Sequence, residues 1–246
     1  MLSNSRNIEL KFKTWKQIEE HLKTSDLIIV PIGAIEQHGP SCPLFTDTLL
    51  AEFFALQVGI LNEVLVAPTI SIGDSLIHLN YPGTISLNPT TLIAVIKDYI
   101  NSLYRAGFRR FLIINGHGDN LGSIMAAFSE LGNELKSLKY ISKDFWDFSG
   151  FRKIMQDEFG DPNGGHADAT DASILLAIDE SLVDKSLLTK EYAKVRYWVS
   201  NDLASELYSK SGVINSDQNL ASALIGCKLI EESIKGYSQL LKDLNE

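Results

Sequence analysis

Cysteine is scarce in this sequence. Only Cys42 and Cys227 occur among 246 residues, and they lie far apart. Two distant thiols argue against a disulfide framework and against a zinc site built from four thiolates, and they fit a reducing compartment. The N-terminal residues lack the apolar core of a secretory signal, and no apolar run reaches the roughly 18 to 20 residues that span a bilayer. We therefore expect a cytoplasmic protein with no membrane partner.

Basic residues are also few relative to acidic ones. The chain has 22 Lys and Arg against 31 Asp and Glu, a net charge of −9. This balance argues against nucleic acid as a partner. Hydrophobic residues at 45% and charged residues at 22% are ordinary for a globular protein. No repeat, low-complexity segment or long linker divides the sequence, so we predict a single domain over residues 1–246.

Short apolar runs alternate with longer segments of helical spacing. This βαβα order predicts an α/β fold, with an open, mainly parallel sheet covered by helices on both faces. A polar, irregular stretch over residues 187–217 is expected to be a lid or a subunit contact. Strands are predicted over 27–32, 64–68, 109–115 and 139–141, and helices over 47–61, 89–104, 120–135, 166 or 169 to 179, and 217–244, the last with a bend at Gly226.

Polar, chemically active side chains follow the predicted strands. In open α/β sheets, ligands bind at the carboxyl ends of the strands. The segments GAIEQHGPSCPLFTD and NGHGDN each follow a strand, and a third segment, NGGHADATD, opens a helix. Four of the five histidines lie in loop-like segments of this kind. The candidate side chains in the three segments are Glu36, His38, Asp47, His117, Asp119, His166, Asp168 and Asp171.

These residue types together favour a metal site. Glu36 and His38 are two residues apart, so an extended backbone points both to the same side. Carboxylate and imidazole ligands suit zinc, manganese or iron. Asp47 can reach the same point from the start of the next helix. With His117 and one more carboxylate, the set predicts a two-metal site in which one carboxylate bridges the ions.

Each segment alone also has a structural explanation. Asp47 suits a helix N-terminus, and NGHGDN suits a tight turn capped by Asp119 or Asn120, or a phosphate nest. Asp168 is expected to be a solvated acid at a helix start. His78 is either a group that orients a ligand or a packed loop histidine. Because these segments occur together at successive strand ends, the metal site is favoured.

Other catalytic chemistries have weaker support. The sequence has no G-x-S-x-G elbow, no Walker A motif and no G-x-G-x-x-G after the first strand. Cys42 lies near His38 in the sequence, which suggests a thiol nucleophile. However, Ser41 and Pro43 flank it in a run of turn residues, so this alternative ranks below the metal site.

The motifs resemble those of the creatininase (creatinine amidohydrolase) family. The matching segments are PIGAIEQHGP, PLFTD, YPGTISL, NGHGDN and GGHADATDAS, in this order. The resemblance implies a three-layer α/β/α fold, two divalent metal ions per chain and a homo-oligomer, commonly a hexamer. Zinc is the favoured metal, with manganese or iron as alternatives.

The resemblance also implies roles for individual residues. Glu36, Asp47 and His117 match the ligands of one ion, and His38 matches a ligand of the other, with Asp47 bridging. His166 matches a histidine thought to act in proton transfer.

Two positions depart from the family pattern. Creatininase proper has an aromatic residue and a glutamate where this sequence has Gly118 and Asp119. Other members take a glutamate ligand from a later motif, and Asp171 occupies the corresponding position in this sequence. Either Asp119 or Asp171 is therefore expected to complete the second metal site, with a slight preference for Asp119 because it shares a loop with His117. The loss of the aromatic residue argues against creatinine as the substrate.

We accordingly expect a metal-dependent amidohydrolase that cleaves the C–N bond of a small cyclic amide or a formamide, with His166 protonating the leaving nitrogen. Three substrate classes remain open: creatinine, the formamide of a pyrimidine intermediate in flavin and deazaflavin biosynthesis, and a peptide undergoing maturation. The deformylase substrate requires a basic cluster for its phosphate. Arg109 and Arg110 lie at the wrong strand end, which leaves Arg196. A metal-binding protein without hydrolytic activity is the rival from another class.

Overall fold

The computed structural model describes residues 6–161, 163–192 and 209–246. The helices and strands that position the site alternate along the chain, as expected. In chain order the elements, with η for 3-10 helices, are η1 (Leu10–Phe12), α2 (Trp15–His21), β1 (Leu27–Ile32), α3 (Thr46–Asn62), β2 (Leu65–Val66), η2 (Leu76–His78), α4 (Pro89–Ala106), β3 (Arg110–Asn115), α5 (Asn120–Glu134), β4 (Lys139–Asp144), α6 (Ser149–Phe159), α7 (Ala169–Ile178), η3 (Glu180–Leu182), η4 (Lys185–Leu187), β5 (Lys190–Glu191), β6 (Ser216–Asp217), η6 (Gln218–Leu220) and α8 (Ala223–Asn245).

The main sheet has four parallel strands in the order β2-β1-β3-β4. All six residues of β1 are buried, as expected for a parallel strand that is covered on both faces. In the register of β1 and β3, Leu27 pairs with Arg110 and Ile32 with Asn115. The two strands therefore end side by side, and the loops that follow them start at the same edge of the sheet.

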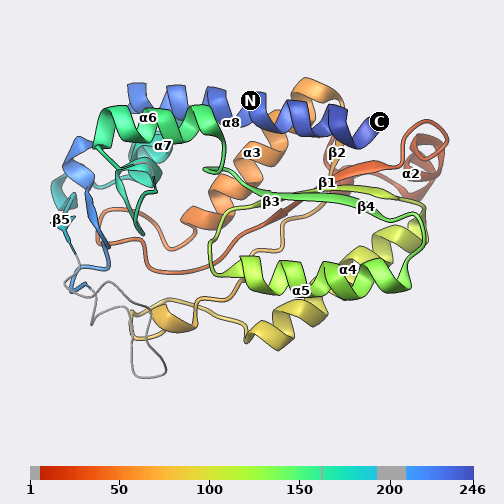
Figure 1. The fold of residues 1–246 in the computed structure, drawn as a ribbon, viewed down its shortest axis with the longest axis horizontal. Coiled ribbons are helices and arrows are strands. Elements are labelled where there is room, and N and C mark those ends of the chain that lie inside the picture. The colour runs from red at the N-terminus through yellow and green to blue at the C-terminus, as the bar shows by residue number, and fades with distance from the viewer. Residues whose placement is uncertain (1–5, 162, 193–208) are drawn as a thin grey trace.

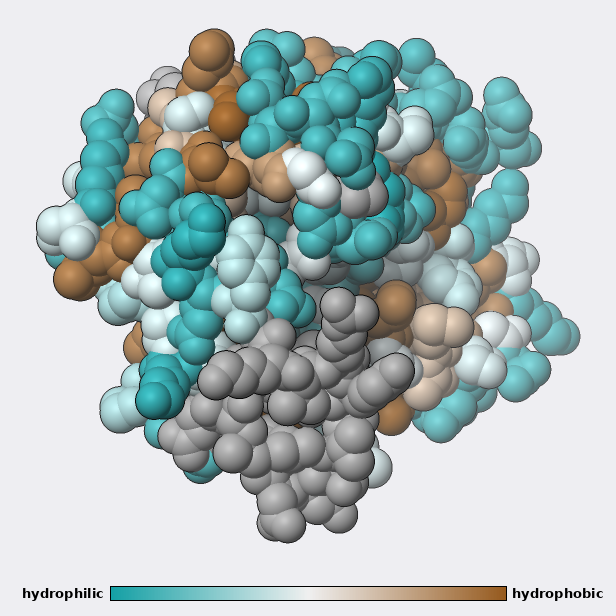
Figure 2. All heavy atoms as spheres, turned by 60° about the vertical axis from the view of Figure 1, so that its left-hand side comes forward, coloured by the Kyte–Doolittle hydropathy of each residue, from teal (hydrophilic) through white to brown (hydrophobic). Residues whose placement is uncertain are grey.

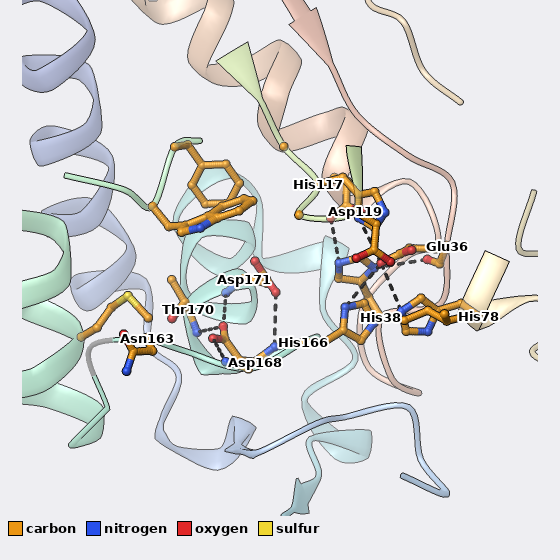
Figure 3. Close-up of a pocket in the computed structure, with 18 residues that line it drawn as sticks. Glu36, His38, His78, His117, Asp119, Asn163, His166, Asp168, Thr170 and Asp171 are labelled. Carbon is orange, nitrogen blue, oxygen red and sulfur yellow. Dashed lines mark hydrogen bonds and ion pairs between the residues drawn. The ribbon is translucent and has the colours of Figure 1, made fainter. Parts of the chain in front are cut away.

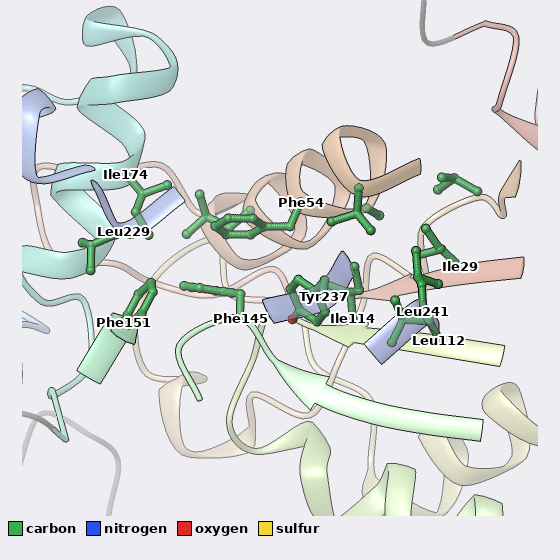
Figure 4. Packing of buried hydrophobic residues seen from close by; sticks show 14 of the residues in the cluster. Ile29, Phe54, Leu112, Ile114, Phe145, Phe151, Ile174, Leu229, Tyr237 and Leu241 are labelled. Carbon is green, nitrogen blue, oxygen red and sulfur yellow. The ribbon is translucent and has the colours of Figure 1, made fainter. Parts of the chain in front are cut away.

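Helices cover both faces of this sheet, which gives the three layers seen in Figure 1. Helices α3, α6, α7 and α8 lie on one face, and α4 and α5 lie on the other. Because successive strand residues point to opposite faces, Ile29 packs toward α3 and α8, whereas Ile28 packs toward α4 and α5. Figure 4 shows the hydrophobic core on the side of α3 and α8, where the rings of Phe54 and Phe145 stack with their centroids 5.0 Å apart. The predicted α/β fold is confirmed.

Helix α8 is continuous through Gly226, where a bend was expected. A Cβ atom at Gly226 would lie 2.0 Å from the carbonyl oxygen of Ser173. The glycine thus permits a close crossing of α7 and α8. The helix also starts at Ala223, later than predicted, because residues 216–220 form β6 and a 3-10 turn.

Other boundaries differ from the prediction. Strand β2 is only two residues long, and β4 extends to Asp144. Helix α6 was not predicted, because its sequence is polar and buries only Phe151 and Met155. Of the expected lid, residues 193–208 lie outside the described part of the chain, while its ends pair as the antiparallel strands β5 and β6. Within the described ranges, none of the helices is both long and apolar enough to span a bilayer.

Candidate metal centre

The start of α3 packs directly against the ends of β1 and β3, and two glycines allow it. A Cβ atom at Gly33 would lie 2.4 Å from Cα of Thr48, and one at Gly116 would lie 2.3 Å from the carbonyl oxygen of Asp47. Any side chain at either position would push the helix away. This close approach brings Asp47, in the first turn of α3, to the edge where both strands end.

Four of the predicted ligands meet at this edge (Figure 3). Nε2 of His38 lies 2.9 Å from Oδ1 of Asp47, and Nδ1 of His117 lies 3.0 Å from Oδ2 of the same carboxylate. Nδ1 of His117 is also 3.4 Å from Oε1 of Glu36. Asp47 thus faces one imidazole with each oxygen. All four side chains are buried.

Two further histidines join this group. Nδ1 of His166 lies 3.4 Å from Oε1 of Glu36, and Nε2 of His78 lies 3.8 Å from the same oxygen. Their rings stack with centroids 4.3 Å apart. The sequence left the role of His78 open, and the structure brings it to the site from the 3-10 turn η2.

The carboxylates of this group lack the partners that burial normally requires. Both oxygens of Glu36 and Oδ2 of Asp47 are buried and, apart from the histidine contacts, have no well-aligned hydrogen-bond partner among the described residues. A buried carboxylate without such partners is costly, and a bound cation would offset that cost. In the part of the chain that the structure describes, two sets of three residues bring their ligand atoms within 4.8 Å of one another: Glu36 with His38 and Asp47, and Glu36 with His78 and His166. Their imidazole and carboxylate donors fit zinc or manganese.

The charges of the group follow from burial and from Asp47. Burial raises the pKa of Glu36 to about 7, although His117 opposes this shift. Burial lowers the pKa of His38, but the attraction of Asp47 outweighs it and raises the value to about 10. Burial lowers the pKa of His78 to about 3 and that of His166 well below its ordinary value. Burial also lowers the pKa of His117, but Glu36 and Asp47 outweigh it and raise the value well above its ordinary range. Without a cation, positive charge therefore lies on the two histidines that contact Asp47.

Asp119 and Asp171 both line the cavity, on different sides of the group. Asp119 lies at the start of α5, and burial raises its pKa while His117 lowers it. Asp171 is the third residue of α7, and one of its oxygens accepts a hydrogen bond from the backbone N–H of Asp168 at 3.2 Å. Burial and Asp168 raise the pKa of Asp171 to about 8, against the effect of His38. Neither aspartate belongs to the two three-residue sets.

Asp168 caps α7, as a residue at a helix start is expected to do. Its Oδ1 accepts hydrogen bonds from the backbone N–H groups of Thr170 at 2.7 Å and Asp171 at 3.1 Å. Only 7% of Asp168 is exposed, so the expectation of a solvated acid is wrong. Asp168 can be buried because the backbone N–H groups of Thr170 and Asp171 replace the water that would bind an exposed carboxylate.

The site opens into a cavity of about 210 Å³. Phe145 and Trp146 form part of its wall, and Phe145 also belongs to the hydrophobic core. Cys42 does not line this cavity, and burial raises the pKa of its thiol to about 12, so a thiol nucleophile has no support. Figure 2 shows the molecule turned so that the left-hand side of Figure 1 comes forward. Hydrophilic residues cover much of the upper part of the face seen in this view.

Gln37 is a buried residue of this site that the sequence analysis did not single out. Its only signal in the sequence was its place between Glu36 and His38. Its side chain contacts both His78 and His166.

Known proteins share this sequence pattern. The sequence model of the family described as creatinine amidohydrolase matches residues 11–241. A 3-dehydro-scyllo-inosose hydrolase of Thermotoga maritima is 39% identical over 106 residues, which are 43% of this chain and only 34% of that protein. Creatinine amidohydrolase of Pseudomonas putida is 28% identical over 195 residues, covering 73% of this chain and 75% of that protein. A mycofactocin precursor peptide peptidase of Mycolicibacterium smegmatis is 28% identical over 228 residues, covering 88% and 84%.

Solved structures share the fold. A crystal structure of creatinine amidohydrolase matches with a TM-score of 0.87 and 25% identity, covering 96% of this chain and 97% of that one. Creatininase structures of comparable similarity include one described with manganese and one described as a zinc–zinc type. The three-layer arrangement of Figure 1 is therefore that of a known group of structures.

Proposed function

Because the chain belongs to the creatininase family of hydrolases, we propose that it uses two divalent metal ions to hydrolyse the C–N bond of a small amide. The observation that carries this proposal is the pair of buried carboxylates, Glu36 and Asp47, which face four histidines. Three of their four oxygens have no well-aligned hydrogen-bond partner among the described residues. Zinc is the favoured ion, and the manganese and zinc forms of related structures support this choice of metals.

One ion is assigned to Glu36, Asp47 and His117, and the other to His38 and Asp47. The bridging role of Asp47 is supported by its two oxygens, which face His38 and His117 separately. Two divalent cations held here would lower the pKa of a water molecule toward neutrality and would polarise the substrate carbonyl.

A further carboxylate is needed beside His38. Asp171 helps to raise the pKa of His38, whereas Asp119 helps to raise the pKa of His117. This difference favours Asp171 for the second ion, against the slight preference for Asp119 that the shared loop suggested. Asp119 then lies where it can bind a polar group of the substrate.

His166 is assigned the transfer of a proton to the leaving nitrogen. Its Nδ1 points toward Glu36 at the floor of the cavity, and only 17% of its side chain is exposed. This place beside Glu36 on the cavity wall suits proton transfer, because a general acid must lie within hydrogen-bond reach of the group that it protonates. Trp146 and Phe145 wall the cavity and limit the size of the amide.

The described cavity wall favours an amide without a phosphate group. None of the described lining residues is Lys or Arg, the side chains that would bind a phosphate. Arg110 opens β3 at the opposite end of the strand and pairs with Asp26. Arg196 lies outside the described residues. At Gly118 a Cβ atom would meet nothing within 4 Å, so the cavity is open at the position where creatininase proper carries an aromatic residue.

Metal analysis and a substrate panel test this proposal. The purified protein is expected to bind two zinc ions per chain and to hydrolyse at least one member of a panel of cyclic amides, formamides and short peptides. Removal of the metal with a chelator should abolish the activity, and added zinc or manganese should restore it. A protein that binds one ion or none and hydrolyses nothing would support the rival, a family member without hydrolytic activity.

A further inference from the structure

The ring of His117 has a defined partner on each side. Its Nε2 lies 2.6 Å from the backbone carbonyl oxygen of Asp74, and the described residues offer this nitrogen no other hydrogen-bond partner. A carbonyl oxygen only accepts, so Nε2 carries a proton and donates it. In the neutral ring Nδ1 is then bare, and this is the atom that lies 3.0 Å from Asp47 and 3.4 Å from Glu36. A bare ring nitrogen is what a metal ion requires.

The carbonyl of Asp74 is placed by the side chain of Asn120, the first residue of α5. The backbone N–H of Asp74 donates to Oδ1 of Asn120 at 3.0 Å. In turn, Nδ2 of Asn120 donates to the carbonyl oxygen of Gly33 at 3.0 Å and to Oδ1 of Asn115 at 3.3 Å. A backbone N–H on one side and a backbone carbonyl on the other define which end of the amide is the NH₂ group. The oxygen and both amide hydrogens of this buried side chain are therefore used.

The partners of Asn120 belong to segments that build the metal centre. Gly33 follows β1 and leads to Glu36. Asn115 ends β3, and its side chain accepts from the backbone N–H of His117 at 3.3 Å and donates to the carbonyl of the same residue at 2.7 Å. Asn120 thus ties the carbonyl of Asp74 to the same frame that holds the backbone of His117.

The segment that carries Asp74 can approach this frame because residue 73 is glycine. A Cβ atom at Gly73 would lie 2.4 Å from Oδ1 of Asn120 and 2.7 Å from the carbonyl oxygen of Gly33. The carbonyl of Gly73 itself accepts from the backbone N–H of Leu87 at 2.8 Å. No side chain fits at position 73 while Asp74 stays against the ring.

We propose that Asn120 is a positioning residue that holds the carbonyl of Asp74 against Nε2 of His117. The bare Nδ1 of that ring then faces Asp47 and Glu36, where one of the two ions is assigned. The inference rests on the proposed function, in which His117 is a ligand of that ion. Partners that orient a ligating histidine typically change metal affinity by roughly 10- to 100-fold.

Zinc titrations of Asn120→Leu test this role. Leucine is similar in size but forms none of the three hydrogen bonds. We expect the affinity for one ion to fall by roughly 10- to 100-fold, while the ion beside His38 keeps its affinity. An asparagine that only stabilised the fold would lower the Tm of the metal-free chain and leave both affinities unchanged.

A matched control is Asn62→Leu at the end of α3. The side-chain amide of Asn62 donates to the carbonyl of Val58 at 2.8 Å and to Oγ of Ser238 at 3.0 Å, and it does not line the cavity. This variant should keep both zinc affinities. If Asn120→Leu does not fold, Gly73→Ala displaces the carbonyl of Asp74 from the other side and should weaken the same ion.

The tautomer of His117 is measurable because the chain has only five histidines. Long-range proton–nitrogen correlation spectra of the full chain, labelled with ¹⁵N-histidine, report which ring nitrogen carries a proton. The signals of His117 are those that disappear in His117→Ala. In the zinc-loaded protein we expect Nε2 of His117 to be protonated and Nδ1 to carry no proton.

Two results overturn the inference: a zinc-loaded protein in which the proton of His117 is on Nδ1, or a folded Asn120→Leu that binds both ions with unchanged affinity. Either result in a chain that binds two ions contradicts the role of Asn120 alone. An unaltered chain that binds no zinc contradicts the metal centre instead. The role of Asn120 is then read from the Nε2 proton of His117, which should exchange with water more slowly in the unaltered chain than in Asn120→Leu, and equal exchange rates would contradict it.

Discussion

Replacing Asp47 with Ala should remove both metal ions at once. Asp47 lies 2.9 Å from Nε2 of His38 and 3.0 Å from Nδ1 of His117, and it is 5% exposed. No other carboxylate makes comparable contacts with both imidazoles within the described part of the chain. If each ion depends on this bridge, neither should bind the variant tightly.

The size of the effect follows from linkage. An ion present at 100 times its Kd stabilises the folded state by about 2.7 kcal/mol. For a chain of 246 residues, each kcal/mol shifts Tm by about 2–4 °C. Each ion should therefore raise Tm by about 5–11 °C at that concentration. Thermal melts with chelator and with added zinc should show this rise in the unaltered protein and none in Asp47→Ala.

A matched control separates metal binding from the loss of a carboxylate. Asp26 pairs with Arg110 at the opposite end of the sheet, where it is partly exposed. Asp26→Ala should lose about 0.2–1 kcal/mol and keep the full response to zinc. If Asp47→Ala retains two ions, or keeps the response of the unaltered protein, the assignment of the bridge is wrong.

Three further outcomes are expected. His166→Ala should keep two ions by elemental analysis and lose about 100- to 10,000-fold in kcat, and a loss of metal would instead make His166 a ligand. Asp171→Asn should weaken one ion in a zinc titration, while Asp119→Asn should mainly raise KM, and the reverse pattern would return the ligand to Asp119. Burial alone would raise the pKa of Glu191, but hydrogen bonds from Ser211, Lys210 and Ser209 lower it to about 2. This pKa is depressed in the folded state, so the ionised Glu191 stabilises the fold at pH 7. Glu191→Gln should therefore reduce the free energy of unfolding at pH 7, and this loss should shrink as the pH falls from about 4.3 toward 2. An equal loss at all pH values would contradict the ionic role of Glu191.

The grouping of Glu36, His38 and His117 was predictable from the sequence because it depends on local rules. Two apolar runs, each followed by glycine and polar residues, indicated parallel strands. Parallel neighbours end at the same edge of a sheet, so their loops had to meet. In the structure, Ile32 at the end of β1 pairs with Asn115 at the end of β3, so the two loops start side by side.

The positions of His78 and Gln37 were not predictable in the same way, because they depend on contacts between distant segments. Gln37 meets His166, which is 129 residues away, and Gly212, which is 175 residues away. No local spacing encodes such contacts. The burial of Asp168 also depends on tertiary packing, since a capping residue has the same sequence signal whether or not the rest of the fold covers it.

The most direct test of the two-metal centre is anomalous scattering at the zinc edge from crystals of the zinc-loaded chain. We predict two peaks that share Asp47, one beside Glu36 and His117 and the other beside His38. A single peak between Glu36, His78 and His166, or no peak near Asp47, would contradict it.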